Sequence, residues 1–213
     1  FTHGDFIYAT DRDGFNSIIS LTEEAKEKEV LVIPDYLDGK LVRIGATSVM
    51  GTLSGNIISE NVKKIFVLMS EERNTSSLRI ESIPNLEKVI QIGEYGFGVV
   101  GLTQNNTTYK GMFWPPLRAD VNNLQHFYAN VIYDYNYDIE QDYYWIDDYD
   151  DELISYKPED PRREDYSFAG WYKEKECINI WDFDNDKVPG KVYDEDGNYL
   201  YQETRLYAKW LLN

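Results

Sequence analysis

Residues 165–174 read DYSFAGWYKE, and residues 204–210 read TRLYAKW. In both stretches aromatic residues alternate with small or polar ones, a pattern typical of β-strands that bury one face. Gly170 inside the first stretch predicts a β-bulge or a close backbone approach. Three explanations fit such a concentration of aromatic rings: a catalytic cleft, a surface on which sugars stack, and the aromatic core of a small β-domain.

We favour the core. Rows of aromatic residues are more often interior than ligand-binding, and each ring buries about 150–250 Å² in a domain too small for a deep aliphatic core. The aromatic signature that we assign to this domain comprises Trp171, Tyr172, Trp181, Tyr207 and Trp210. A sugar-binding surface stays open as the alternative, and it would require exposed, coplanar rings.

Further strands surround the two stretches. VIYDYNY at residues 131–137 alternates as a strand does. VYDEDGNYLY at residues 192–201 is typical of a hairpin, because the pair Asp196 and Gly197 suits a tight turn. The acidic residues 147–152 indicate a solvated loop or the start of a short helix.

Four motifs in a fixed order resemble the Listeria–Bacteroides repeat, the B-repeat module of internalin-like surface proteins. They are VIYDYN (131–136), P-x-x-x-x-Y-x-F-x-GWY (161–172), WDFDND (181–186) and LYAKW (206–210). The resemblance implies a small β-grasp-like α+β domain with strands packed against a helix. Two departures stand out: Asp165 replaces a common Gly, and the hairpin at residues 188–203 is longer than usual and is a candidate for a property specific to this protein.

The first part of the chain contains an internal repeat. NVKKIFV (61–67), NLEKVIQ (85–91) and NLQHFYA (123–129) share a template of Asn, an apolar residue, two polar residues and two apolar residues. LVRIGATSVMG (41–51) and KVIQIGEYGFG (88–98) share a second one. A period in the low twenties predicts stacked units with a common core. A meandering sheet with coincidental similarity remains the alternative.

These segments, with LVIPDYLDGKLVRIG at residues 31–45, resemble BspA-like leucine-rich repeats. The resemblance covers about residues 5–129 and implies a short solenoid on a bacterial surface protein. Phe97 occupies the aromatic position of the pattern and Val49 replaces it in the first copy. In the same segment, Pro34 should end a strand and the pair Asp38 and Gly39 should form a turn.

The charge limits the partners. The chain has 21 basic and 38 acidic residues and a net charge of −17. Such a protein repels polyanions, so we expect no nucleic-acid binding. No run of 18 apolar residues is present, so we expect no membrane insertion by this segment. A protein partner should present a basic surface.

The sequence predicts no catalytic, cofactor-binding or metal site. The two histidines, His3 and His126, lie near a chain end and inside a repeat, and no nucleophile–base motif is present. Cys177 is the single cysteine, which favours a small buried side chain. Asp182, Asp184 and Asp186 would share one strand face and resemble a calcium site, but solvated turn acids explain them better.

We therefore expect a mainly β protein: a short leucine-rich-repeat solenoid at residues 1–129, then a small β-grasp-like α+β domain at residues 130–213. By resemblance, it is a bacterial cell-surface or secreted module for adhesion and protein recognition, and not an enzyme. Its partner would be a host or matrix protein or a glycan, bound through the exposed strand or loop face of the solenoid. A carbohydrate-binding or glycosidase-accessory protein is the alternative.

Overall fold

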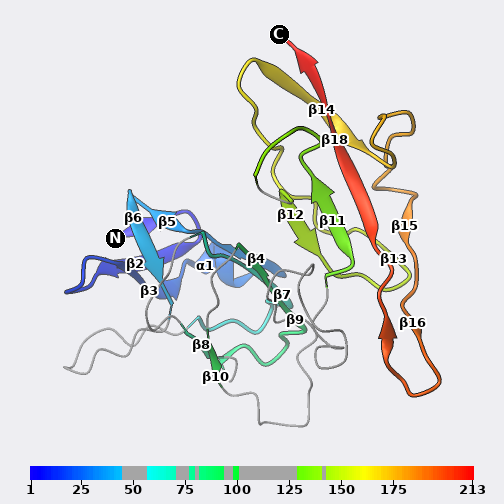
Figure 1. Ribbon diagram of the computed structural model, residues 1–213. Coiled ribbons are helices and arrows are strands. Elements are labelled where there is room, and N and C mark those ends of the chain that lie inside the picture. The colour runs from blue at the N-terminus through cyan, green and yellow to red at the C-terminus, as the bar shows by residue number, and fades with distance from the viewer. Residues whose placement is uncertain (45–56, 71–76, 80–81, 94–97, 101–128, 141–142) are drawn as a thin grey trace. The chain divides into compact units, whose positions relative to one another are not determined.

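The computed structural model describes residues 1–44, 57–70, 77–79, 82–93, 98–100, 129–140 and 143–213 (Figure 1). The chain forms two compact units, Phe1–Ala119 and Asp120–Asn213. The predicted mainly β fold is confirmed, since α1 is the single α-helix in the described parts and spans four residues. No helix of the described residues is long and apolar enough to cross a membrane.

The first unit is built from short strands. In chain order they and the helix are β1 (Thr2–His3), β2 (Phe6–Thr10), β3 (Asn16–Leu21), α1 (Glu23–Lys26), β4 (Val30–Ile33), β5 (Tyr36–Leu37), β6 (Lys40–Arg43), β7 (Lys64–Leu68), β8 (Ser77–Arg79), β9 (Lys88–Ile92) and β10 (Gly98–Val100). They form a five-stranded sheet in the order β1-β2-β3-β6-β5, a parallel sheet β4-β7-β9 and a parallel pair β8-β10.

Local sequence explains the first sheet and the helix. The strand expected before Pro34 is β4, and Asp38 and Gly39 turn the chain between β5 and β6 with positive φ angles of 45° and 75°. Both predictions are confirmed. Thr22 caps α1, because its Oγ1 accepts the N–H of Ala25 at 3.2 Å and satisfies one of the free donors of the first turn.

The repeat template determines the register of the parallel sheet. In it, Ile65 of β7 lies beside Val89 of β9, and Phe66 lies beside Ile90. These pairs are 24 residues apart, which is the spacing of the first two template copies. The predicted equivalence of residues 61–67 and 85–91 is therefore confirmed. The third copy, at residues 123–129, falls almost wholly outside the described residues, as do the positions of Val49 and Phe97.

Both faces of this parallel sheet are buried. Ile65 and Val89 belong to the core of the unit, while Phe66 and Ile90, whose side chains point to the opposite face, are also inaccessible to solvent. The exposed strand face expected to bind a partner is therefore not found at Phe66 and Ile90.

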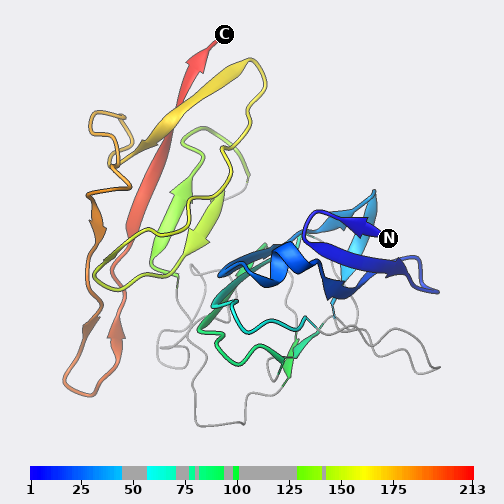
Figure 2. The same cartoon turned by 180° about the vertical axis from the view of Figure 1, so that it is seen from behind.

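The second unit contains a four-stranded sheet and two short pairs of strands. Its elements are β11 (Val131–Asp134), β12 (Trp145–Asp147), β13 (Glu152–Leu153), β14 (Tyr166–Tyr172), β15 (Lys187–Val188), β16 (Val192–Tyr193), β17 (Tyr199–Leu200) and β18 (Thr204–Leu212). The sheet has the order β12-β11-β18-β14, with β11 and β18 parallel and the other pairs antiparallel. Strands β14 and β18 run side by side in both views (Figures 1 and 2).

The predicted strands at 166–172 and 204–210 and the hairpin at 192–201 are confirmed, whereas the strand predicted at 131–137 ends at Asp134. Gly170 has φ +115° and lies in a β-bulge between Phe168 and Trp171, as predicted. The bulge has a consequence that simple alternation missed: Trp171, and not Tyr172, lies on the same face as Phe168, and the two rings contact each other at 5.1 Å between centroids.

The acidic segment 147–152 is only in part the solvated loop that we expected: residues 150–152 are exposed, but residues 147–149 are buried. It begins at Asp147, the last residue of β12, and both Asp147 and the following Asp148 are buried. Partners explain their burial: Asp148 pairs with Lys191 at 2.6 Å, and Asp147 Oδ1 accepts the N–H of Asp148. The described residues of this unit contain no helix, so the helix of a β-grasp arrangement is not seen among them.

Candidate functional site

The aromatic signature divides between the interior and the surface of the second unit. Trp171 and Trp181 are only 1% and 8% exposed, whereas Trp210 is half-buried. Trp171 packs edge-on against Tyr133, with 4.9 Å between ring centroids. Trp210 donates from Nε1 to the carbonyl oxygen of Tyr135 at 2.6 Å, which ties β18 to the chain after β11. These tryptophans join the strands of the sheet.

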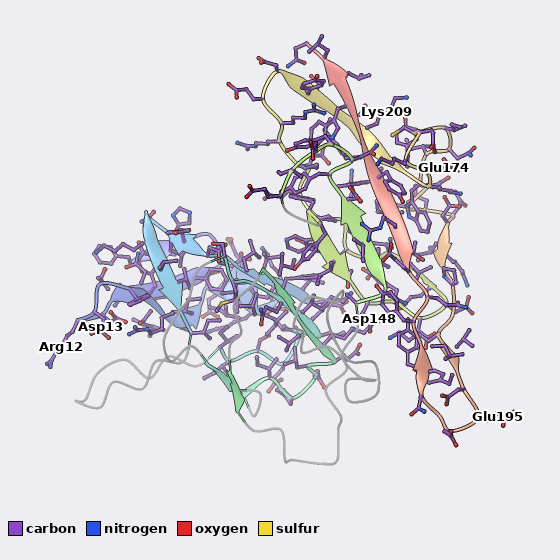
Figure 3. All side chains as sticks on the ribbon, in the orientation of Figure 1. Arg12, Asp13, Asp148, Glu174, Glu195 and Lys209 are labelled. Carbon is purple, nitrogen blue, oxygen red and sulfur yellow. The ribbon has the colours of Figure 1, made fainter. Side chains whose placement is uncertain are left out.

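Tyr172 and Tyr207 lie on the other face of the sheet. They are cross-strand partners in β14 and β18, and both are half-buried. The ammonium group of Lys209 lies 4.9 Å from the centroid of the Tyr172 ring, within the range of a cation–π contact. Figure 3 labels Lys209 on β18 and Glu174 just beyond β14. The signature therefore contributes to both faces of the sheet, not to one core.

A second aromatic group surrounds Arg163. Its guanidinium carbon lies 3.7 Å from the ring centroid of Tyr166, 4.3 Å from that of Tyr137 and 5.9 Å from that of Trp210. All of these side chains are half-buried. The guanidinium group covers one face of each of the Tyr137 and Tyr166 rings, so that face of each ring is not open for flat stacking of a sugar.

The aspartates at 182–186 form a turn and do not share a strand face, so the preferred interpretation as turn acids is confirmed. Asp182 Oδ1 accepts the N–H of Asp184 at 2.9 Å, and Asp182 Oδ2 accepts the side-chain amide of Asn185 at 2.9 Å. Asp186 pairs with Lys173 at 2.7 Å. The hydrogen bond from Asn185 lowers the pKa of Asp182, and the one from Lys173 lowers that of Asp186. Such self-contained turns are a common use of aspartate.

No three His, Cys, Asp or Glu side chains among the described residues are grouped as a metal site would require. Of the two histidines, His126 lies outside the described residues. His3 Nδ1 lies 2.8 Å from Asp38 Oδ1, and the hydroxyl of Tyr8 donates to the other oxygen of Asp38. These hydrogen bonds, that of Tyr8 first, lower the pKa of Asp38. The three groups fasten β1 and β2 to the β5–β6 turn.

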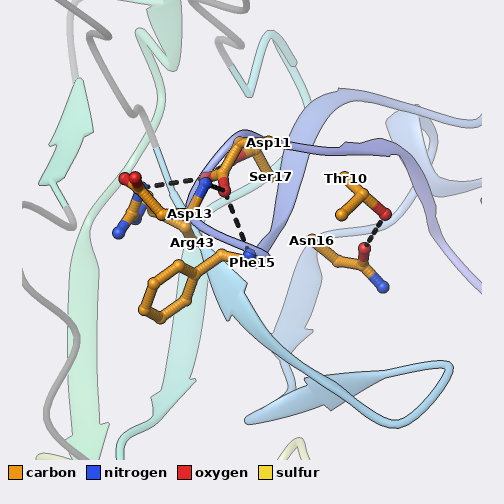
Figure 4. Close-up of polar contacts among 7 residues, drawn as sticks. All are labelled: Thr10, Asp11, Asp13, Phe15, Asn16, Ser17 and Arg43. Carbon is orange, nitrogen blue, oxygen red and sulfur yellow. Dashed lines mark hydrogen bonds and ion pairs between the residues drawn. The ribbon is translucent and has the colours of Figure 1, made fainter.

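A buried ion pair stabilises the start of the first unit (Figure 4). Arg43 Nη1 lies 2.9 Å from carboxylate oxygens of both Asp11 and Asp13, and its guanidinium carbon lies 3.9 Å from the centre of the Phe15 ring. Asp11 also accepts the hydroxyl of Ser17 at 2.9 Å. The Arg43 side chain is 8% exposed, so its charge is compensated in the interior. The arrangement attaches the β2–β3 turn to β6.

Cys177 and Asn136 were not predicted to meet. Asn136 has φ +56°, and its Nδ2 lies 3.1 Å from the carbonyl oxygen of Ala208 and 3.0 Å from that of Lys175. The half-buried thiol of Cys177 lies 3.3 Å from the same nitrogen, and burial raises its pKa. The only sequence signal for this contact is the Asn that ends the VIYDYN motif.

The four motifs thus meet in one sheet: the first supplies β11, the second β14 and the last β18, while Trp181 of WDFDND donates its backbone N–H to the carbonyl oxygen of Trp171 at 2.8 Å. Residues 130–209 match the family model of the Listeria-Bacteroides repeat domain. The predicted family of the second domain is confirmed over this range. Searches of curated proteins and of solved structures found no match to the chain.

The match assigns most of the second unit to one family. The Listeria-Bacteroides repeat domain contains the complete four-stranded sheet except the last residues of β18. It also contains the long hairpin β16–β17, which we had noted as a departure from the usual pattern.

Proposed function

We propose that this chain is a non-catalytic protein-recognition module of a bacterial cell-surface or secreted protein. The observation that carries the proposal is the repetition of equivalent contacts along the parallel sheet of the first unit. Repeats of this kind build extended surfaces for protein partners. The matched Listeria-Bacteroides repeat domain supports a surface location.

The first unit, in this proposal, is a short solenoid of the BspA-like leucine-rich-repeat type. Support comes from backbone hydrogen bonds that recur from one repeat to the next. They join three equivalent positions: Glu29, Lys63 and Glu87. The N–H of Lys63 donates to Glu29 O at 2.8 Å, and the N–H of Glu87 donates to Lys63 O at 2.7 Å. The side chains of Glu29 and Lys63 also pair at 2.7 Å.

The Listeria-Bacteroides repeat domain is proposed to be β-grasp-like. Its strand order supports this assignment, because the first and last strands, β11 and β18, are central parallel neighbours and each has an antiparallel strand on its other side. Aromatic side chains cover the face that contains Trp171: Tyr133 and Tyr144 contact that ring, at 4.9 Å and 6.0 Å between centroids.

Carbohydrate binding is the second candidate. The half-buried Trp210 favours it, since a partly exposed indole ring near other aromatic residues can stack on a sugar. The position of Arg163 over Tyr137 and Tyr166 weakens it, because one face of each of these two neighbouring rings is already occupied.

The test uses the full chain in three assays. A panel of host matrix proteins should yield a partner whose association slows as salt rises, because long-range steering by the net charge of −17 is screened. A glycan array should remain negative, and a panel of glycan and peptide substrates should release no product. Binding to glycans alone would favour the second candidate, and product release abolished by a single Asp or Glu substitution would overturn the non-catalytic role.

A further inference from the structure

The β16–β17 hairpin exposes large apolar side chains. Val192, Tyr193 and Leu200 are 41%, 50% and 48% exposed. Val192 and Leu200 are directly opposite each other in the hairpin, so they form one continuous apolar spot. Exposed apolar side chains grouped in this way mark interaction sites more often than isolated ones do.

The hairpin is held in place at its base. Lys191 Nζ lies 2.6 Å from Asp148 Oδ1, and the Asp148 side chain is 3% exposed. The backbone N–H of Lys191 donates to Asp150 Oδ1 at 2.7 Å. Tyr199, the cross-strand partner of Tyr193, is buried. These contacts anchor the face of the hairpin that carries Tyr193 and Tyr199, so Val192 and Leu200 are presented in a fixed position on the opposite face.

Acidic side chains lie at both ends of the hairpin. Asp150 and Asp151 lie beside the start of the hairpin, within 3.7 Å and 3.5 Å of the Cβ position of Gly190. Glu195 and Asp196 are exposed in its turn, and Figure 3 shows Glu195 at the tip. The charge of Lys191 is already compensated by Asp148. An apolar centre with acidic side chains at both ends complements a partner that carries basic and apolar side chains together.

The hairpin also offers a backbone edge. Strands β16 and β17 form a two-stranded sheet and pair only with each other in the described part of the unit. The outer edge of such a pair accepts an extended segment through main-chain hydrogen bonds. A second copy of this chain is a poor candidate for that segment, because each copy has a net charge of −17.

We propose that the surface formed by Val192 and Leu200, with acidic side chains at both ends of the hairpin, binds an extended protein segment in which lysine or arginine alternates with apolar residues. The proposal rests on the protein-recognition role given above, for which it names the surface and the chemistry of the partner.

The test measures calorimetric binding of the full chain to three synthetic peptides of equal length: alternating lysine and valine, alternating lysine and serine, and alternating glutamate and valine. We expect the lysine–valine peptide to bind at least about tenfold more tightly than either of the others. The double substitution Val192→Ser/Leu200→Ser should remove this preference. The matched control, Ile178→Ser/Ile180→Ser, removes two other exposed apolar side chains of the same unit and should leave it unchanged.

A charge variant tests the acidic side chains in the turn of the hairpin. Glu195→Gln/Asp196→Asn should weaken the lysine–valine peptide and reduce the dependence of its affinity on salt, while Glu176→Gln should change neither. Thermal melting of each variant confirms folding, and Leu200→Ser alone replaces the double variant if that one does not fold. Equal binding of the lysine–valine and lysine–serine peptides, or an unchanged preference in the folded serine variants, would overturn the proposal.

The outcome of the hairpin test can be distinguished from the outcome of the matrix-protein test of the proposed function. If a matrix protein binds the wild type and the hairpin variants equally, the recognition role stands and the hairpin is not its surface. If the variants lose self-association in sedimentation while peptide binding is unchanged, the surface joins two copies of the chain and the proposal is wrong. If the peptide preference depends on the hairpin although no matrix protein binds, the assignment of the surface is supported and the matrix-binding role fails.

Discussion

Asn85 donates a hydrogen bond from Nδ2 to the carbonyl oxygen of Glu60 at 2.6 Å. The equivalent residue of the preceding copy, Asn61, donates from Nδ2 to the carbonyl oxygen of Lys26 at 3.0 Å. In each case the acceptor lies just before the preceding strand of the parallel sheet: Lys26 before β4, and Glu60 before β7. The Asn that begins the template therefore joins one repeat to the one before it, which explains why the template begins with this residue.

Replacing Asn85 with alanine should destabilise the first unit by about 0.5–1.5 kcal/mol, the usual net value of one such hydrogen bond. The measurement is urea unfolding of the full chain. Glu60→Ala is the matched control, because it removes an exposed side chain but keeps the accepting carbonyl, and it should change the free energy of unfolding by less than about 0.5 kcal/mol. Equal effects of the two substitutions would refute this role of Asn85.

Gly93 should not tolerate alanine. It has φ +121°, and a Cβ there would lie 2.2 Å from the carbonyl oxygen of Met69, a backbone atom that cannot move aside. We expect Gly93→Ala to cost at least about 2 kcal/mol, since backbone strain and overpacking act together. Gly14→Ala is the control: φ is +88°, but nothing lies within 4 Å of the added carbon. If both variants have the same melting temperature, the close approach to Met69 does not contribute to the loss of stability.

Trp171→Ala should destabilise the Listeria-Bacteroides repeat domain by about 3–5 kcal/mol, as expected when a large aromatic side chain is removed from a core. Trp171→Phe keeps a ring against Tyr133 and should cost less. The readout is the near-ultraviolet dichroism and the melting temperature. An unchanged melting temperature in Trp171→Ala would show that this ring is not part of the core.

Alkaline pH should unfold the same domain. Burial raises the pKa of Tyr144 to about 12 and shifts those of Tyr133, Tyr149 and Tyr201 upward as well. A tyrosine whose pKa is higher in the folded state than in the unfolded state contributes its full stabilisation below pH of about 10, the pKa in the unfolded state. This stabilisation is lost as the pH rises from about 10 toward the pKa in the folded state. The free energy of unfolding should therefore fall above pH of about 10. Tyr144→Phe should make this fall less steep, and a pH-independent free energy would contradict the assignment.

The local sequence predicted the strands. It did not predict which side chains the bulge turns to each face of the sheet, or that two acidic residues are buried. Alternation located β14, yet the extra residue near Gly170 exchanged the faces of Trp171 and Tyr172. The acidic residues 147–148 favoured an exposed segment in the sequence, because Lys191, the ion-pair partner of Asp148, lies 43 positions later in the chain. Contacts of this kind depend on tertiary packing, which periodicity and propensity do not contain.

The candidate surface was only partly foreseen. The unusual length of the hairpin at residues 188–203 indicates a property specific to this protein, and the pair Asp196 and Gly197 predicts its turn. The sequence did not show which of its apolar side chains would be exposed, since Tyr193 and Tyr199 are the same residue type and only Tyr199 is buried. The two are cross-strand partners on the same face of the hairpin, so the alternation of side chains does not distinguish them.

The parallel pairing of β11 with β18 has a mechanical consequence. Val131 lies beside Thr204 and Asp134 beside Tyr207, so both strands run in the same direction at the centre of the sheet. Tension applied at residues 130 and 213 pulls these neighbours in opposite directions along their length, and their hydrogen bonds must break together rather than one by one. Rupture under force depends on the unfolding barrier. Stretching the domain between these residues should therefore require more force than pulling apart β14 and β18 from residues 166 and 212, which opens that ladder from one end.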